Sequence, residues 1–432
     1  MDNHWLPFLL MAVAFAVTSI AYPFVLAFAR RHGIVDNPSV RKLQRVPVPV
    51  MGGTAVFIGF LTAEVAGWFF LPSEKVMILT ALLATMFAIG VWDDIVDVSA
   101  EFRFMVELLI VWLMILLLGV EVNHFHGFLG INEVPDAVSV PFSLIAGVGI
   151  INAINMIDGV DGYCSTYGMM ACAVFAALFW KAGDIPMFAL ALITIGALLP
   201  FFFHNVFGKT SKMFLGDGGS LMLGTLLAFF MFNTLTAEHP CDQAFDDTGL
   251  SLVALCLAVL AIPVFDTLKV MVIRLVRGQS PFHPDKSHLH HLYIEMNYSH
   301  MATSAIIVLH NILILGLLLL SWWLGGADST WQVLIVIGAA LLYTWGFYFF
   351  MEGQRRKNDG EGTALWKRMC VHGNNFTALP LSVFIRRIVD SKWLGGGGWL
   401  PQPQNKIDPR VGNPSPTLKR AKDAVSRIAE EE

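Results

Sequence analysis

The chain has 432 residues, of which 56% are hydrophobic and only 14% are charged, and its formal net charge is −5 at pH 7. A water-soluble surface needs far more charge, so this composition excludes a single soluble globular domain. The mean hydropathy of +0.63 indicates that lipid is the solvent for most of the chain. The sequence has no basic nucleic-acid-binding stretch, and its five cysteines suggest neither a disulfide framework nor a metal knuckle.

One crossing of the hydrocarbon core takes about 20 apolar residues in a helix. The sequence therefore predicts an all-α polytopic membrane protein with about eleven transmembrane helices. We expect these spans near 5–29, 50–71, 75–92, 104–122, 139–157, 163–181, 185–204, 217–236, 250–276, 302–324 and 331–351. They divide the chain into a transmembrane domain, 1–351, and a cytoplasmic tail, 352–432, which we expect to be partly interfacial and largely disordered at its end.

The positions of Lys and Arg predict the orientation in the membrane. In total, 25 of the 28 lie in one set of alternate loops and in the tail. Cytoplasmic loops carry the excess of positive residues, so we expect the N-terminus outside and the C-terminus in the cytoplasm. The opposite loops, 123–138, 237–249 and 325–330, contain no Lys or Arg and suggest simple external turns. We expect His124 and His126, in the first of these loops, to be solvated rather than bound to a metal.

Carboxylates gather on the predicted cytoplasmic face. An ionisable group at mid-bilayer costs about 2.5–3.5 kcal/mol and is seldom kept without a use. The candidates are Asp93, Asp94 and Asp97 after the third span, Asp158 and Asp161 after the fifth, and Asp217 at the start of the eighth. Magnesium takes hard oxygen ligands, often one or two from protein together with phosphate oxygens. A solvated helix end is the alternative interpretation of Asp93 and Asp94.

Two further segments favour phosphate chemistry. Asp217 lies in a glycine-rich turn at a helix N-terminus, where free backbone N–H groups can face a phosphate. The loop from Arg277 to His291 is rich in histidine and allows three interpretations: a zinc site, a pH-responsive surface loop or a cationic anchor for phosphate. Neighbouring Arg274 and Lys286 favour the phosphate anchor. A rival function, an ion-coupled transporter of an anionic solute, predicts ionisable groups near mid-bilayer and paired broken helices.

The order and spacing of these motifs closely resemble the polyprenyl-phosphate N-acetylhexosamine-1-phosphate transferase family, glycosyltransferase family 4. The resemblance rests on D-N-P-x-x-R-K with M-G-G at 36–53, D-D-x-x-D at 93–97, N-x-x-N-x-x-D-G-x-D-G at 152–162, G-D-x-G-S at 216–220 and H-x-H-H at 288–291. The last motif, preceded by R-G-x-S-P-F, is similar to the WecA and TagO branch. The tail beyond 352 has no family motif.

This resemblance implies an eleven-span enzyme of the bacterial inner membrane with its active site facing the cytoplasm. The implied substrates are a UDP-N-acetylhexosamine, chiefly UDP-GlcNAc, and undecaprenyl phosphate, and the products are undecaprenyl-diphosphate-sugar and UMP. This would be the first membrane step of a cell-envelope polysaccharide such as O antigen, lipopolysaccharide or a cell-wall polymer. The implied cofactor is Mg²⁺, with Mn²⁺ as an alternative, and membrane lipids are the expected surroundings. The hexose, the polyprenyl length and the oligomeric state, with a homodimer as one option, stay open.

The resemblance also implies residue roles. It assigns the magnesium ion to Asp217 and Asn155, the uracil ring to Asp161 and Phe214, the diphosphate to His288, His290 and His291, and the lipid phosphate to Arg103, where relatives often have Lys. We expect Asp93 or Asp94 to orient or deprotonate the attacking lipid phosphate, and a double displacement through an aspartyl intermediate stays open. Asp97, Asp158 and Asp266 belong to the motifs without an assigned role.

Overall fold

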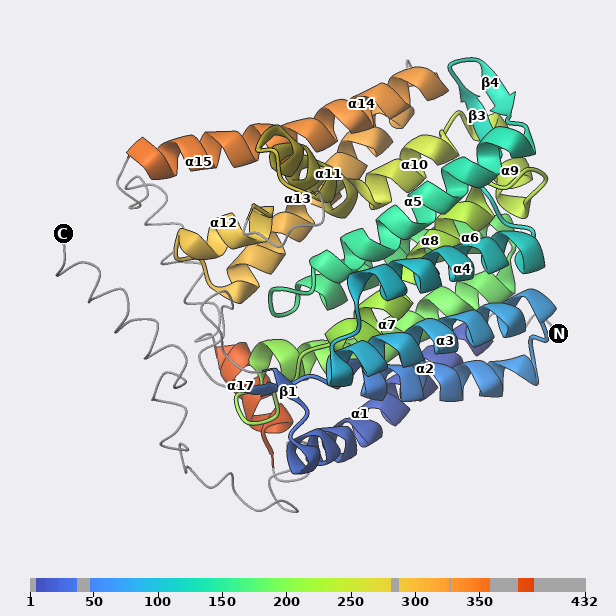
Figure 1. Ribbon diagram of the computed structural model, residues 1–432. Helices are drawn as coiled ribbons and strands as arrows, with labels where there is room; N and C mark the ends of the chain where they lie inside the picture. Colours follow the sequence, from blue (N-terminus) through green and yellow to red (C-terminus); the bar gives the residue numbers. More distant parts are fainter. Residues whose placement is uncertain (1–4, 37–46, 281–286, 326–327, 358–379, 392–432) are drawn as a thin grey trace.

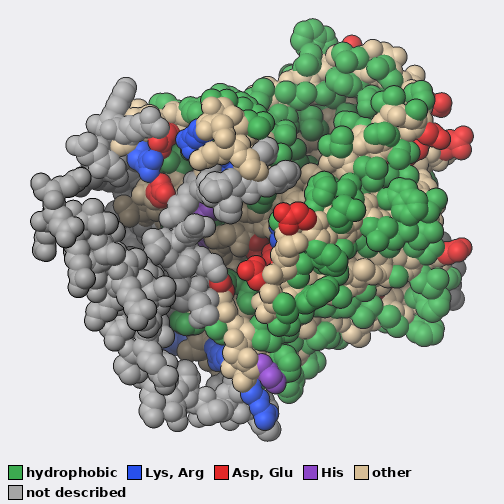
Figure 2. Space-filling view, in the orientation of Figure 1, with side chains coloured by type: hydrophobic (Ala, Val, Ile, Leu, Met, Phe, Trp, Pro, Cys, Tyr) green, Lys and Arg blue, Asp and Glu red, His purple; other side chains and the backbone are tan. Residues whose placement is uncertain are grey.

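The structure is a computed structural model that describes residues 5–36, 47–280, 287–325, 328–357 and 380–391 (Figure 1). About 78% of it is helical. The predictions for residues 281–286 of the histidine loop and for the disordered end of the tail lie outside the described residues. Hydrophobic side chains cover much of the visible flank of the helical bundle, whereas the visible Lys and Arg side chains lie at the left and near the centre of the view, away from its right end (Figure 2).

A helix, or a pair of consecutive helices, occupies each of the expected spans. The long helices of the first half are α1 (Leu6–His32), α2 (Gly52–Trp68), α3 (Glu74–Val96), α4 (Ala100–Leu118), α5 (Asp136–Met156), α6 (Tyr163–Ala182) and α7 (Ile185–Phe207). They are followed by α8 (Gly216–Thr234), α9 (Pro240–Phe245), a 3-10 turn (Asp246–Thr248), α10 (Leu252–Val259), α11 (Ala261–Val276), α12 (Leu289–Glu295), α13 (His300–Trp323), α14 (Ser329–Leu341), a π-helical turn (Leu342–Gly346), α15 (Phe347–Lys357) and α17 (Pro380–Val389).

The described helices make this a polytopic membrane protein. Seven of them are long and apolar enough to cross a membrane, or eight if α10 and α11, which are bent by 68°, form one broken span. Three other bundle helices are shorter or more polar: α2 has 17 residues, α4 carries Glu101, Arg103 and Glu107, and α8 begins beside Asp217. Polar residues at these last two helices therefore point to a site within the bundle.

Local sequence explains where many of the helices begin. A side-chain oxygen just before the first turn accepts a hydrogen bond from a free backbone N–H, and this contributes about 1 kcal/mol. The residues that do so are Ser73, Ser99, Asp184, Ser251, Ser299 and Asp328. Glycines in the left-handed conformation end α1, α4 and α6, so capping residues set the loop boundaries.

Helix α8 is the axis of the bundle. Every residue from Gly218 to Thr234 is buried, and α2, α3, α5 and α6 all contact it. The N–H groups of Gly52 and Gly53 donate to the carbonyls of Phe214 and Leu215, at 2.8 and 2.7 Å. A methyl group on Gly53 would lie 2.5 Å from the Gly219 nitrogen. The start of α2 is therefore fixed directly against the start of α8.

We expect Gly53→Ala to destabilise the protein. The new methyl group would meet backbone atoms that have no rotamer to change, and overpacking of this kind costs about 1–3 kcal/mol. Gly338→Ala, in α14, is the matched control because a methyl group added there would meet no described atom within 4 Å; it should be neutral or stabilising. Thermal unfolding in detergent measures both, and equal unfolding midpoints would contradict the close-contact argument.

Two small antiparallel sheets lie at opposite ends of the bundle, and the all-α prediction missed them. Strand β1 (Val35–Asp36) pairs with β2 (Val48–Pro49), and β3 (His124–Phe128) pairs with β4 (Ile131–Glu133). The first sheet lies at the end that also holds α12 and α17, whereas the second lies near α9 at the other end (Figure 1). The prediction of simple turns in loop 123–138 is therefore wrong for this hairpin.

Candidate active site

Asp93 and Asp94 lie in the last turn of α3, where they face different partners. Asp93 Oδ1 accepts a hydrogen bond from the Val98 N–H at 2.8 Å, and its Oδ2 accepts one from Arg103 Nη1 at 3.1 Å. The Asp94 carboxylate instead accepts from the N–H groups of Asp217 and Gly218, at 2.9 and 3.2 Å. Asp94 therefore caps α8, while Asp93 holds Arg103.

Asp158 reinforces the same helix terminus from the loop after α5. Its carboxylate accepts a hydrogen bond from the Gly216 N–H. Burial first, and then the carboxylates of Asp217 and Asp94, raise the pKa of Asp158 well above its ordinary value. Carboxylates at a helix N-terminus satisfy free N–H groups and complement the helix dipole. Their crowding nevertheless leaves an excess of acidic groups that a cation would relieve.

Asp217 is the acidic group that these contacts leave most available. Asn155, in α5, donates to Asp217 Oδ1 at 2.6 Å and to Ser220 Oγ at 2.9 Å. Asp217 Oδ2 lies 3.8 Å from Arg103 Nη1. Its side chain is 34% exposed, against 6% for Asp93, so Asp217 faces the open part of the site.

The donor set fits magnesium. It consists of carboxylate and amide oxygens, the hard ligands that this ion prefers, and Asp217 Oδ2 is not occupied by the Asn155 hydrogen bond. Asn155 donates its side-chain N–H to Asp217, so the amide oxygen of Asn155 stays available as a second metal ligand. These two residues would hold the ion, with phosphate oxygens and water as the other ligands.

A buried pair extends the polar network into the bundle. Glu107 of α4 is 1% exposed and lies 3.6 Å from Arg103 Nε, and it also accepts a hydrogen bond from Asn152. Buried charges of this kind need partners, and Glu107 has both a cation and an amide. The sequence predictions omitted Glu107, although a glutamate in an apolar helix is itself a signal of a functional site.

A second cluster surrounds Asp161, between α5 and α6. Asp161 Oδ2 lies 2.5 Å from Lys212 Nζ and 3.1 Å from His300 Nδ1. The Lys212 ammonium lies 5.6 Å from the centre of the Phe214 ring, so the structure brings Asp161 and Phe214 to one place. Lys212 and His300 are members that the sequence predictions missed.

The Asp161 carboxylate is ionised and has one unused acceptor. Burial alone would raise its pKa, but the hydrogen bond and charge of His300 and the charge of Lys212 lower it below the ordinary value. Asp161 Oδ1 is buried without a hydrogen-bond partner among the described residues. A buried acceptor without a donor is costly, so this oxygen suits a ligand that supplies an N–H.

The segment that carries Lys212 and Phe214 is held from several sides. Asn205 accepts from the Gly162 N–H at 2.6 Å and donates to the Met213 carbonyl at 2.8 Å. From the tail, Asp390 accepts from the N–H groups of Lys209, Thr210 and Ser211 and from the hydroxyls of the last two. These bonds lower the pKa of Asp390 although burial opposes them. The tail therefore contributes to the position of the site.

Asp266 gains a role that the sequence did not reveal. It accepts hydrogen bonds from His288 Nδ1 at 2.9 Å and from the Leu289 N–H at 3.1 Å, and it pairs with the fully buried Lys269 at 2.6 Å. Asp266 thus anchors the start of α12, which carries the H-x-H-H motif, onto α11.

The anchored histidines reach the loop of Asp158 and Asp161. A methyl group on Gly159 would lie 2.9 Å from His290 Nε2. Burial, followed by the charges of His291 and His288, lowers the pKa of His290 well below its ordinary value, so its imidazole is neutral at pH 7. The neutral ring can donate one hydrogen bond to a phosphate oxygen but adds no charge.

The structure therefore unites most of the predicted site. Asp93, Asp94, Arg103, Asn155, Asp158 and Asp217 meet at the start of α8, and Asp161 with Phe214 and the histidines adjoins them through the 157–162 loop. Asp97 stands apart: it ends α3 in the left-handed conformation, with φ of 59°, and its side chain is exposed. Cys164, Cys172, Cys241 and Cys256, the cysteines among the described residues, are free thiols.

The chain is similar in sequence to known proteins. The sequence profile of glycosyl transferase family 4 matches residues 76–234. The chain is 29% identical over 304 residues to "Probable undecaprenyl-phosphate N-acetylglucosaminyl 1-phosphate transferase" of Bacillus subtilis (strain 168), which covers 69% of this chain and 81% of that protein. It is 26% identical over 339 residues to "Undecaprenyl-phosphate alpha-N-acetylglucosaminyl 1-phosphate transferase" of Escherichia coli O157:H7, covering 76% and 88%. The protein of that name from Yersinia pestis is 29% identical over 299 residues, covering 67% and 78%.

Fold and site together define a polytopic membrane protein with a cluster of carboxylates, amides and cations at one end of its bundle. The matched region runs from the first turn of α3 to the end of α8, so it includes the Asp217 cluster and, apart from His300, the Asp161 cluster. Over these residues the chain is similar to glycosyl transferase family 4, and the relatives extend that similarity over two thirds or more of the chain.

Proposed function

We propose that this protein transfers GlcNAc-1-phosphate from UDP-GlcNAc to undecaprenyl phosphate, giving undecaprenyl-diphosphate-GlcNAc and UMP. The observation that carries the proposal is the junction of two clusters: Asp217 with Asn155 and Arg103 for phosphates, next to Asp161 with Phe214 for a base. The relatives are named for the same transfer. An ion-coupled transporter needs ionisable groups near mid-bilayer, whereas both of these clusters lie at one end of the bundle.

The residues would divide the substrates between them. Asp161 Oδ1 would accept the ring N–H of uracil while Phe214 stacks on the base, and the His288 to His291 turn would contact the diphosphate. Arg103, whose Nη1 lies between Asp93 and Asp217, would bind the phosphate of the lipid. Arg pairs with phosphate through two N–H groups, so it fixes orientation as well as charge.

Asp217 and Asn155 would hold Mg²⁺, or Mn²⁺ in its place, which would neutralise charge on the diphosphate. In the transfer, an oxygen of the lipid phosphate attacks the β-phosphorus of the sugar nucleotide. The bond from that phosphorus to the bridging oxygen breaks, and UMP leaves. Because a phosphate monoester has its second pKa near 6, the attacking oxygen needs positioning more than deprotonation.

A single displacement suits the hydrogen bonds of the two adjacent aspartates. Both oxygens of Asp93 and both oxygens of Asp94 already accept hydrogen bonds, which lowers their strength as nucleophiles. Asp93 would orient Arg103, and Asp94 would hold the start of α8. Incubation with labelled UDP-GlcNAc without lipid, followed by acid quench, tests this: a covalent phosphoprotein would overturn the single displacement.

We propose that the chain crosses the bacterial inner membrane eleven times, with its N-terminus outside and its tail in the cytoplasm. It is supported by the distribution of Lys and Arg and by the helices that occupy each expected span. The active site would then face the cytoplasm, where UDP-sugars are made. Labelling of single cysteines placed at Glu133 and at Lys209 in intact cells distinguishes the two faces.

The function itself is tested with the full-length protein in detergent. Undecaprenyl phosphate, MgCl₂ and one of several UDP-sugars are supplied, and UMP release is measured. We expect release with UDP-GlcNAc, its loss when lipid is omitted, and its loss when EDTA is added. Turnover with another UDP-N-acetyl sugar and none with UDP-GlcNAc would refute the sugar assignment, and no UMP with any sugar would refute the function.

We expect Asp161→Asn to raise KM for UDP-GlcNAc by roughly tenfold or more, because Lys212 and His300 lose their anionic partner and the base loses a charged acceptor. The KM for undecaprenyl phosphate should not change, which makes it the internal control. Initial rates of UMP release at varied concentrations of each substrate measure both constants. A rise in both KM values would contradict a role confined to the nucleotide.

A further inference from the structure

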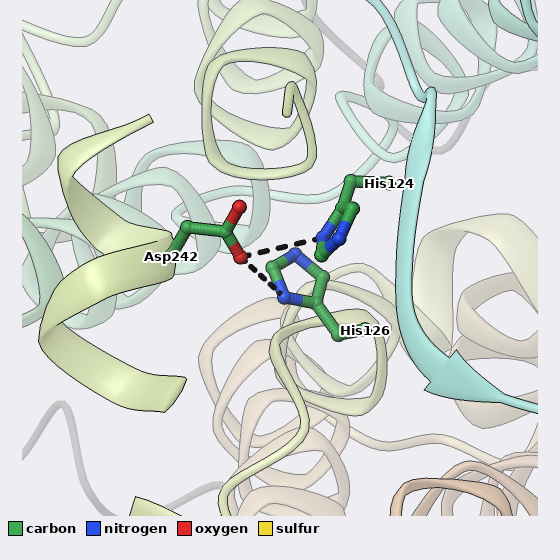
Figure 3. A group of neighbouring side chains, drawn as sticks. All are labelled: His124, His126 and Asp242. Atoms are coloured by element: carbon green, nitrogen blue, oxygen red, sulfur yellow. Dashed lines mark ion pairs between the residues drawn. The ribbon is translucent and has the colours of Figure 1, made fainter. Parts of the chain in front are cut away.

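Three side chains gather at the end of the bundle opposite to the active site (Figure 3). His124 and His126 come from β3, and Asp242 comes from α9, more than a hundred residues later. His124 Nδ1 lies 3.3 Å and His126 Nδ1 lies 2.9 Å from the same oxygen, Asp242 Oδ1. Folding thus supplies the carboxylate that the sequence around the two histidines lacks.

The histidines are not solvated, contrary to the sequence-based expectation. The side chains are 17% exposed for His124 and 12% for His126, and Asp242 is 22% exposed. The ring centroids of the histidines are 4.2 Å apart in an edge-to-face arrangement. The three side chains therefore share one partly buried focus, where one ligand atom from each lies within 4.8 Å of the others.

The backbone of β3 is shaped so that both rings reach one point. Residues i and i+2 of a regular strand point to the same side but stay well separated along it. The β3–β4 pairing is irregular between His124 and Phe128, and His126 has a positive φ of 48°, which is uncommon for a residue other than glycine. This irregularity turns both Nδ1 atoms toward Asp242.

We propose that His124, His126 and Asp242 form a binding site for a divalent transition-metal ion, with Zn²⁺ as the expected occupant. Ligand atoms about 2.0–2.1 Å from a tetrahedral zinc ion lie about 3.3 Å from each other, close to the distances of 3.3 and 2.9 Å seen here. Imidazole nitrogens select zinc-like ions over magnesium and calcium, which take oxygen ligands. Water would complete the coordination.

The ion would join the hairpin after α4 to the short helix after α8. The residues that lead into these two elements already meet through hydrogen bonds, such as those from the Ala237 N–H to Asn123 Oδ1 at 2.8 Å and from the His124 N–H to the Leu235 carbonyl at 3.0 Å. The site shares no residue with the Asp217 cluster or the Asp161 cluster. Zinc would therefore stabilise this end of the protein and would leave the proposed transfer reaction unchanged.

The experiment measures zinc in the full-length protein after treatment with EDTA, resupply of Zn²⁺ and gel filtration. The test variants are His124→Gln combined with His126→Gln, and Asp242→Asn alone, which keeps the shape of the side chain. The matched control combines His32→Gln and Asp247→Asn, both of which change exposed residues outside the cluster. We expect wild type and control each to bind one more zinc ion per chain than the double histidine variant binds.

Thermal unfolding and a spectroscopic probe complete the test. Zinc should raise the unfolding midpoint of wild type and control but not of either test variant, because only a bound ion stabilises the folded state. Co²⁺ in place of Zn²⁺ should give the intense visible absorption of a four-coordinate site in wild type, which tests the site even if a variant misfolds. Equal zinc content in all proteins, or wild type without that absorption, would overturn the proposal.

Discussion

In Asp217→Asn, UMP release should fall by at least roughly 100-fold while the folded protein remains. Asn keeps the size of the side chain and an oxygen that can accept the Asn155 hydrogen bond, so the start of α8 should stay in place. It loses the negative charge that faces Arg103 and the proposed magnesium ion. Removal of one group that stabilises developing charge commonly lowers turnover by about 100- to 1,000-fold.

Asp136→Asn provides the matched control for this experiment. Asp136 is also an aspartate in the first turn of a helix, but it is exposed and lies in α5 at the opposite end from the site. We expect the turnover of Asp136→Asn to match that of wild type. Activity is measured over a range of MgCl₂ concentrations, and full activity of Asp217→Asn at ordinary magnesium would contradict our assignment of the metal ligand.

Asp266→Asn should unfold at a markedly lower temperature. Lys269 is fully buried and would lose the carboxylate that lies 2.6 Å from its ammonium. Removal of one partner from a buried ion pair costs about 3–5 kcal/mol because an uncompensated charge remains. The exposed pair between Arg355 and Glu295 offers a comparison, since Glu295→Gln should change stability by less than about 1 kcal/mol.

A second substitution separates stability from function at Asp266. In Asp266→Asn combined with Lys269→Met, no buried charge is left unpaired, so thermal stability should recover in part. Activity should not recover, because His288 and the Leu289 N–H still lack the carboxylate that holds the histidine turn. Recovery of both properties would show that Asp266 serves stability alone.

Much of the fold could be predicted from the hydrophobic segments of the sequence and from the positions of its charged residues. The ends of long apolar segments placed helices at α1 to α8 within a few residues, because Ser, Asp and Gly caps coincide with the polar breaks. The motifs also placed Asp93, Asp94, Asn155, Asp161 and Asp217 near one another, as the hydrogen bonds among them show for the cluster at α8. Lateral packing, such as that of Gly53 against Gly219, has no signature in a single sequence.

Partners that come from distant segments could not be predicted. Lys212 and His300 meet Asp161 through tertiary folding, and Asp242 meets His124 and His126 across more than a hundred residues. Two adjacent aspartates are also indistinguishable by sequence alone, although Asp93 binds a side chain and Asp94 caps a helix. Such differences depend on the direction in which each side chain points, which adjacency in sequence does not reveal.

The contact of the tail with the 209–211 segment matters for how this protein is shortened or tagged. Asp390 satisfies three consecutive backbone N–H groups beside the segment that carries Lys212, and Arg386 donates to the Phe207 carbonyl at 3.1 Å. A protein truncated after the last membrane helix would lack both residues, and these backbone N–H and carbonyl groups would lose their partners. For expression and crystallisation, the catalytic unit therefore extends through Asp390, and affinity tags belong after it.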